Sequence, residues 1–338
     1  MLKKTLQWLV PKKVRDFRKR KLNNYSLKKE LKAAYLYDLN RYLKYTDAFG
    51  SDIETNLISR IIRNYHVIEK GLTMPEARLG FGRNNLITLV MDCLKYIQKY
   101  GKEDEQIIHA IGVILEYELF HHQKKFKLDN EIVYYIETIR NNIENIAVCS
   151  QVETTKNEYF KYSNCSFPEF ANSRSSIRNY SKEEIPTERI INALELARNT
   201  PSACNRQCWR TYIYSDKTEI CNILEIQGGN RGFGHLTNKL IVIAAEVGVF
   251  SNIAERNEAY IDGGIYAMNL LYAIHYQRIA GCILNCSNTI EKDIKLRKIC
   301  KIKDSEVFIA MIACGIPPET FYVASSKRYN LEKTNKIF

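Results

Sequence analysis

The chain has 338 residues, of which 45% are hydrophobic and 26% are charged, a composition typical of a folded protein with one large domain or two ordinary ones. No stretch approaches 18 uncharged apolar residues, and the N-terminus lacks the apolar core of a secretory signal. We therefore expect no transmembrane helix and a cytoplasmic location. The net charge of +12 is uneven, because the first 50 residues contain 14 Lys and Arg against 4 Asp and Glu.

Residues 1–25 form a basic segment. Leu2, Leu6 and Leu9 fall on one helical face, and Pro11 ends that helix early. One interpretation is that this segment rests on an anionic membrane surface, which would make the protein peripheral at the inner face of the membrane. A solvated terminus is the other interpretation, and both stay open. Since no DNA- or RNA-binding motif is present, we expect no nucleic-acid partner.

Residues 26–150 are predicted to form a helical extension. Ser26 is expected to cap a helix that runs to about Asp47 and ends at Gly50. Ser51 and Glu54 form a capping box for a second helix, which runs to Gly71. Apolar periodicity predicts further helices over 85–100, 104–126 and 129–148. Residues 151–172 lose this periodicity and are predicted to be a linker.

From residue 173 to 338 the pattern alternates between helix and strand. We expect helices at 187–199, 259–279 and 289–300, and strands at 209–214, 239–247, 281–285 and 306–314. The apolar run of the 239–247 strand predicts a central position in the sheet. The fold class is therefore α+β, a central sheet flanked by helices and preceded by an all-helical N-terminal region.

The ten cysteines are too dilute for a disulfide scaffold, and several lie in apolar runs, so we interpret them as free thiols. Cys204 and Cys208 form one C-x-x-x-C pair, and Cys282 and Cys286 form another. Structural zinc sites favour tighter loops, so we predict no metal site. The sequence also lacks a dinucleotide fingerprint and a phosphate-binding Walker lysine.

Four polar clusters are the candidate site. In the first, guanidinium groups and hydroxyls suit a phosphate, although a surface basic loop would look the same. In the second, a loop with hydroxyl and amide groups suits a flat heterocycle. The third has a glycine where a ring could approach the backbone, and the fourth is another phosphate anchor. The clusters are Arg174, Ser175, Ser176 and Arg178; Pro201, Ser202, Asn205 and Gln207; Gly281 and Cys282; and Ser326 and Arg328.

The order and spacing of these clusters resemble the nitroreductase family. The family segment R-x-S-V-R-x-F/Y is matched by Arg174, Ser176, Ile177, Arg178 and Tyr180. The segment A-R-x-A-P-S-x-x-N-x-Q-P-W is matched by Ala197, Arg198, Pro201, Ser202, Asn205, Gln207 and Trp209, with Cys208 in place of the proline. Later matches are Asp262, Gly264, Asn269, Leu270, Leu271, Gly281, Gly315, Pro317, Ser326 and Arg328.

This resemblance implies a homodimer with FMN at the subunit interface. It implies that the first and fourth clusters bind the phosphate and ribityl chain, that the second lines the isoalloxazine ring, and that the Gly281–Cys282 backbone faces the reactive edge. Asn230 and Phe233 would also border the flavin. Arg178 is the candidate positive charge beside the reduced ring, and no residue is assigned as an acid or base.

The implied activity is hydride transfer from NAD(P)H to FMN and then, in a ping-pong order, to an unidentified small-molecule acceptor. The alternative is a non-catalytic flavin-binding or scaffold protein tethered to membrane by residues 1–25. The stretch from His66 to Leu72 also resembles the helical extension of nitroreductase-like proteins of bacterial surface-polysaccharide gene clusters. His66, Glu69 and Lys70 either reach the active site or form ordinary ion pairs at a helix end.

Overall fold

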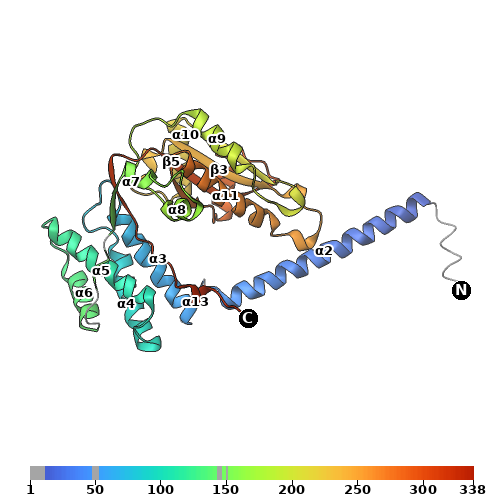
Figure 1. The fold of residues 1–338 in the computed structure, drawn as a ribbon. Coiled ribbons are helices and arrows are strands. Elements are labelled where there is room, and N and C mark those ends of the chain that lie inside the picture. Colours follow the sequence, from blue (N-terminus) through green and yellow to red (C-terminus); the bar gives the residue numbers. More distant parts are fainter. Residues whose placement is uncertain (1–11, 48–52, 143–146, 150) are drawn as a thin grey trace. The chain divides into compact units, whose positions relative to one another are not determined.

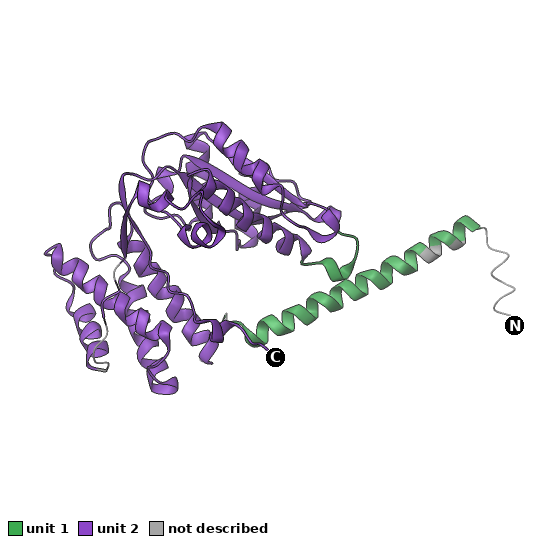
Figure 2. Cartoon of the chain, viewed as in Figure 1, with its two compact units in different colours: residues 1–51, 250–257 green, residues 52–249, 258–338 purple. Residues whose placement is uncertain are grey.

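A computed structural model describes residues 12–47, 53–142, 147–149 and 151–338. The chain forms two compact units, coloured separately in Figure 2. The first is Met1–Ser51 with Phe250–Asn257, and the second is Asp52–Val249 with Glu258–Phe338. The predicted helix before Pro11, its end at Pro11, and the predicted roles of Gly50 and Ser51 all lie outside the described residues.

The first unit consists mainly of one long helix, α2 (Lys12–Tyr45). The prediction that a helix begins at Ser26 is wrong, because Ser26 lies inside α2 and its hydroxyl donates to Glu30 Oε1 at 3.1 Å. The residues before Ser26 are rich in Lys and Arg, which are good helix formers, so nothing interrupts the helix there. Within this unit, Arg256 donates from Nε and Nη2 to the Asp38 carboxylate at 2.7 and 2.9 Å.

The helical extension belongs to the second unit. Its helices are α3 (Glu54–Leu72), α4 (Arg83–Tyr100), α5 (Glu105–Gln123) and α6 (Asn130–Asn142), which confirms the predicted series. They share one apolar core, in which Leu57, Ile61, Leu89 and Ile111 are nearly or fully buried. This core is formed because each helix carries apolar residues at helical spacing on one face.

The sheet of the second unit has the order β2-β3-β5-β4, and every neighbouring pair is antiparallel. Figure 1 labels its two interior strands, β3 and β5. Its strands are β2 (Trp209–Tyr214), β3 (Lys239–Glu246), β4 (Ala280–Asn285) and β5 (Glu306–Gly315). All four were predicted, and β3 has the predicted interior position with seven of its eight residues buried. The α+β fold class is therefore confirmed.

Two layers of helices cover this sheet. Alternation along β3 sends Ile241 and Ile243 to the face covered by α9 (Thr187–Ala197) and α11 (Glu258–Tyr276). Leu240 and Val242 point to the other face, which α10 (Lys217–Gln227) and α12 (Ile290–Cys300) cover. The predicted helices are confirmed, whereas α10 was not predicted.

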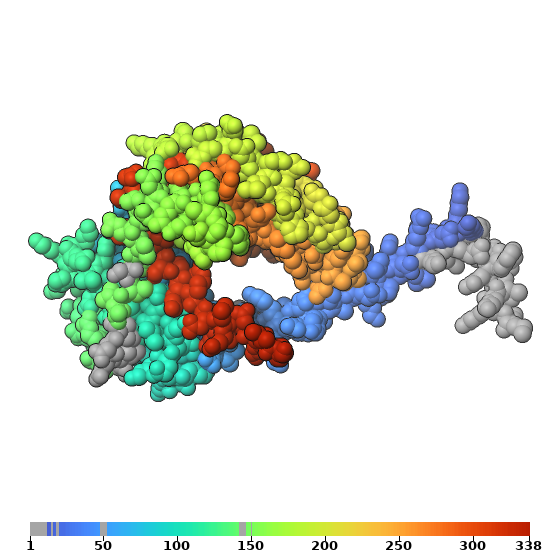
Figure 3. Space-filling view, viewed as in Figure 1, coloured from blue at the N-terminus to red at the C-terminus, as the bar shows by residue number. Residues whose placement is uncertain are grey.

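A second, two-stranded sheet joins distant parts of the chain. The segment predicted as a linker contains β1 (Val152–Thr155), α7 (Lys156–Phe160) and α8 (Phe167–Ser173). Strand β1 pairs antiparallel with β6 (Thr320–Val323). After β6 the chain passes along the extension to α13 (Leu331–Thr334), and the space-filling view shows this red segment against the helices (Figure 3). Lys333 Nζ donates to Asp104 Oδ2 there at 2.9 Å.

Short 3-10 turns complete the described elements: η3 (Ala203–Asn205), η4 (Gly234–Leu236), η5 (Val247–Val249) and η6 (Ile253–Glu255). In the described part of the chain, no helix is both long and apolar enough to cross a membrane.

Candidate functional site

Residues of the first and fourth predicted clusters line one cavity of about 250 Å³. We call it the arginine cavity, and its lining is Arg174, Ser175, Ser176, Arg178, Ser326 and Arg328 with His66, Ala324 and Ser325. No carboxylate is among these described lining residues. Three guanidinium groups and four hydroxyls therefore surround one small space, which is the donor set that a phosphate group requires.

The backbone contacts of residues 174–180 explain how this segment presents its side chains. Ile177 N donates to Gly281 O at 3.2 Å, so the segment runs beside the start of β4. The Tyr180 hydroxyl donates to Ile177 O at 2.7 Å and to Ala313 O at 2.9 Å. Ile177 is fully buried in the core, whereas its neighbours Ser176 and Arg178 line the cavity, as alternation in an extended segment requires.

The other side of the cavity is a tight turn after β6. Ser326 has a φ of 46°, in the left-handed region that few residues other than glycine adopt. Its backbone N–H donates to Glu69 Oε1 at 3.2 Å, and the Ser325 hydroxyl donates to the same oxygen at 2.9 Å. Arg328 Nη1 donates to Ser326 O at 2.8 Å. The backbone conformation of this turn thus determines the position of the Arg328 side chain.

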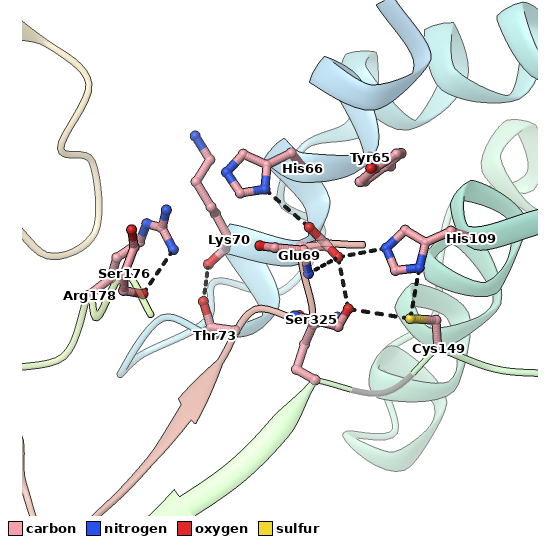
Figure 4. Close-up of polar contacts among 12 residues, drawn as sticks. Tyr65, His66, Glu69, Lys70, Thr73, His109, Cys149, Ser176, Arg178 and Ser325 are labelled. Atoms are coloured by element: carbon pink, nitrogen blue, oxygen red, sulfur yellow. Dashed lines mark hydrogen bonds and ion pairs between the residues drawn. The ribbon is translucent and has the colours of Figure 1, made fainter. Parts of the chain in front are cut away.

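Glu69 is the centre of a buried polar network (Figure 4). Its side chain is 0% exposed, and it accepts from His66 Nδ1 at 3.1 Å and His109 Nε2 at 2.9 Å. Burial opposes ionisation of Glu69, but hydrogen bonds from His109, His66 and Ser325 outweigh burial and lower the pKa of Glu69 to about 2.

His109 is the cationic partner in this network. Burial opposes its charge, but contacts with the Cys149 sulfur and the Glu69 carboxylate outweigh burial and raise the pKa of His109 to about 9. The Cys149 Sγ lies 3.3 Å from His109 Nδ1 and 3.4 Å from Ser325 Oγ. Glu69 and His109 lie 40 positions apart on different helices, so no local sequence pattern indicates that they pair.

Lys70 lies one helical turn after His66 on α3. Burial and the neighbouring Arg178 guanidinium lower the pKa of Lys70, while Cys282 opposes this effect. Among the described residues, no carboxylate lies within 4.0 Å of its ammonium group. A partly buried cation without an acidic partner is costly, so this position suits an anionic ligand.

Gly281 and Cys282 begin β4 beside this cation. A Cβ on Gly281 would lie 2.6 Å from Ile274 Cδ1, the far end of a flexible side chain on α11, so an added side chain would make Ile274 shift. Burial raises the pKa of the Cys282 thiol, and burial also raises that of Cys208 to about 11. Both side chains are therefore thiols rather than thiolates near neutral pH.

The second predicted cluster forms a strained loop, residues 201–208. Cys204, Asn205 and Gln207 have φ values of 52°, 55° and 48°. Ser202 Oγ accepts from Gln207 N at 3.0 Å, and Gln207 Nε2 donates to Asn205 Oδ1 at 3.2 Å. Asn205, Gln207 and Pro201 are exposed. Three left-handed residues in one exposed loop are the kind of strain that accompanies ligand sites.

The strained loop and the arginine cavity lie at opposite corners of the sheet. Trp209, next to the loop, aligns through β3 with Val307, whereas Gly281 aligns with Cys314. Three strand spacings and seven residues give a diagonal of roughly 25 Å. The loop is anchored to α11 by Asp262, which accepts from Ala203 N at 3.1 Å. One chain therefore does not bring the two halves of the predicted site together.

Asn230 lines neither the arginine cavity nor the strained loop, and its amide N–H groups are already used within the protein. Its Nδ2 donates to Leu224 O and, at 3.3 Å, to Gln227 Oε1, so the side chain covers the end of α10. The next residues line a larger cleft of about 820 Å³, which we call the Lys70 cleft. Its lining includes Lys70, Met74, Arg78, Phe81, Arg231 and Phe233.

Among the described residues, no group of three or more His, Cys, Asp or Glu side chains is arranged to hold a metal ion. All ten cysteines are free.

Comparisons with known proteins found similar solved structures and a matching family model. Similar solved structures include an FMN-dependent nitroreductase from Clostridium difficile R20291, with 20% identity, a TM-score of 0.43 and coverage of 49% of this chain and 96% of that one. Nitroreductase family proteins from Streptococcus pneumoniae TIGR4 and Clostridium novyi NT are both 17% identical, with TM-scores of 0.43 and 0.40. They cover 51% and 46% of this chain, and 100% and 86% of their own.

No curated protein matches the sequence. The model of the nitroreductase family matches residues 171–229, a segment that contains both the arginine-rich stretch from Arg174 to Arg178 and the strained loop.

Proposed function

We propose that the protein is an FMN-dependent oxidoreductase that takes hydride from NAD(P)H and reduces a small-molecule acceptor in a ping-pong order. The observation that carries this proposal is the arginine cavity, in which segments about 150 residues apart converge on a space without a carboxylate. The family match over residues 171–229 supports the same cofactor and an oxidoreductase activity.

The donor set fits the phosphate of FMN. Arg174, Arg178 and Arg328 would bind it through guanidinium groups, with Ser175, Ser176 and Ser326 adding hydroxyl donors. Bound FMN would supply hydride exchange between donor and acceptor. Arg178 and Lys70 would place positive charge beside the cofactor, which favours its reduced, anionic form. The buried thiols of Cys208 and Cys282 are protonated and are not proposed as nucleophiles.

We propose a homodimer, because the two halves of the site are too far apart within one chain. The five-carbon ribityl chain between phosphate and ring is much shorter than the sheet diagonal. A second copy would supply its strained loop, with Pro201, Ser202, Asn205 and Gln207, to the ring. The exposed face of α11 supports this arrangement, because it carries an apolar stripe at helical spacing, namely Tyr260, Ile261, Ile265, Met268 and Tyr276.

The acceptor and the cellular role are separate proposals. The Lys70 cleft is a candidate acceptor site because it combines cations with apolar side chains. The resemblance of the extension suggests a link to surface-polysaccharide biosynthesis. Membrane association through residues 1–25 predicts that their deletion abolishes binding to anionic liposomes, and unchanged binding would refute it.

The absorbance spectrum of the purified protein tests the proposed function. We expect flavin bands that bleach on anaerobic addition of NADH or NADPH. Flavin bands that persist with both donors would favour a non-catalytic flavin-binding protein. A colourless protein that does not take up added FMN would refute the proposal.

A further inference from the structure

The inference begins from the fully buried, ionised carboxylate of Glu69. An ionised group out of contact with water requires several hydrogen bonds, and Glu69 has four. Their donors come from α3 itself, from α5 and from the turn at Ser325 and Ser326. The carboxylate therefore links the helical extension to the segment that carries Arg328.

The bond to Ser326 acts on a strained residue. A left-handed φ at a residue other than glycine is unfavourable, so it persists only where the surroundings enforce it. Glu69 Oε1 accepts from both Ser325 Oγ and Ser326 N, and thus holds the turn from both of its residues. Since Arg328 donates to Ser326 O, its position depends on the same turn.

The hydrogen bond between Glu69 and His66 holds a second residue that lines the arginine cavity. Nδ1 of His66 faces the Glu69 carboxylate, and its side chain is 36% exposed where it lines the arginine cavity. Nε2 has no hydrogen-bond partner among the described residues. A histidine ring with N–H groups on both nitrogens can donate from Nδ1 to a carboxylate and from Nε2 to a bound anion, and the carboxylate fixes the orientation of the ring.

We propose that the helical extension completes the FMN phosphate site, with His66 as a phosphate ligand and Glu69 as the residue that positions both His66 and the Ser325–Ser326 turn. This inference rests on the proposed function. It gives the extension a role in discriminating FMN from riboflavin, which has the same ring and ribityl chain but no phosphate.

The test compares the affinities of the full-length apoprotein for FMN and for riboflavin, measured by quenching of flavin fluorescence. The variants are His66→Gln and Glu69→Gln, with His122→Gln as a matched control, since His122 is an exposed histidine of the same extension outside the cavity lining. Loss of one charge-assisted hydrogen bond is expected to weaken FMN binding about tenfold or more in both variants. Riboflavin binding should change less than about twofold.

The ratio of the two affinities separates a phosphate-site role from general damage to the fold. The inference is overturned if both flavins bind equally more weakly to the variants, or if His66→Gln binds FMN as tightly as wild type. In either case, FMN binding by the wild-type protein leaves the proposed function in place. His66 is partly exposed, so its variant keeps the test decisive even if Glu69→Gln does not fold. A wild-type protein that binds neither flavin would instead overturn the proposed function itself.

Discussion

Replacement of His109 by glutamine should remove a pH-dependent contribution to stability. The His109 pKa of about 9 lies above its ordinary value of 6.5. Protonation of His109 therefore stabilises the fold fully below pH 6.5, and this contribution is lost as the pH rises through about 9. This difference between the pKa values of the folded and unfolded protein corresponds to about 3 kcal/mol of folding free energy at pH 6. The lowered pKa of Glu69 includes the same ion pair, together with hydrogen bonds from His66 and Ser325, so it is not added to this contribution.

Urea unfolding followed by far-ultraviolet circular dichroism measures this contribution at pH 6 and pH 9.5. We expect His109→Gln to lower the free energy of unfolding by about 3 kcal/mol at pH 6 and by about 1 kcal/mol at pH 9.5, where His109 is mostly neutral. His122→Gln, which changes an exposed histidine of the same helix, should have no such effect. The reasoning is refuted if wild type and His109→Gln lose the same stability between the two pH values.

Three further changes test other parts of the molecule. Ile265→Glu, in the exposed stripe of α11, should give a monomer by light scattering and weaken FMN binding about tenfold or more, whereas Ile290→Glu, an exposed residue of α12, should leave the dimer intact. Gly315→Ala should destabilise the fold by about 1–3 kcal/mol in urea, since its Cβ would lie 2.3 Å from Tyr180 Cγ, and wild-type stability would contradict this. Lys70→Met should lower the flavin midpoint potential by about 30 mV in a spectroscopic titration, and an unchanged potential would exclude a role for this cation.

The regular elements of the second half were predictable because their apolar patterns are local. The apolar runs of β3 and β5 indicated buried interior strands, and α11 carried helical spacing over its whole length. Strand β1 was missed because its sequence, VETT, is short and polar, and its partner β6 lies more than 160 residues later. Ser26 was misread as a helix cap because a serine that can cap a helix also fits inside one.

The candidate site was only partly predictable for the same reason. Arg174, Ser176 and Arg178 occur in one recognisable segment, and the structure brings them to Ser326 and Arg328. By contrast, Glu69 and Ser325 are 256 positions apart, and nothing in their local sequence indicates that they meet. The charge of Glu69 was the available signal, because an acidic residue on the apolar face of a helix requires a buried partner.

The same contacts imply that the segment matched by the nitroreductase family is not sufficient to build the site. A chain without the helical extension would keep Arg174 and Arg178 but would lose His66 and the acceptor for Ser326 N–H. The turn would then keep the bond from Ser325 N to Gln151 Oε1, but the left-handed Ser326, to whose carbonyl Arg328 donates, would lose its acceptor. In the proposed function, the extension is therefore part of the cofactor site and not a separate module added to an oxidoreductase.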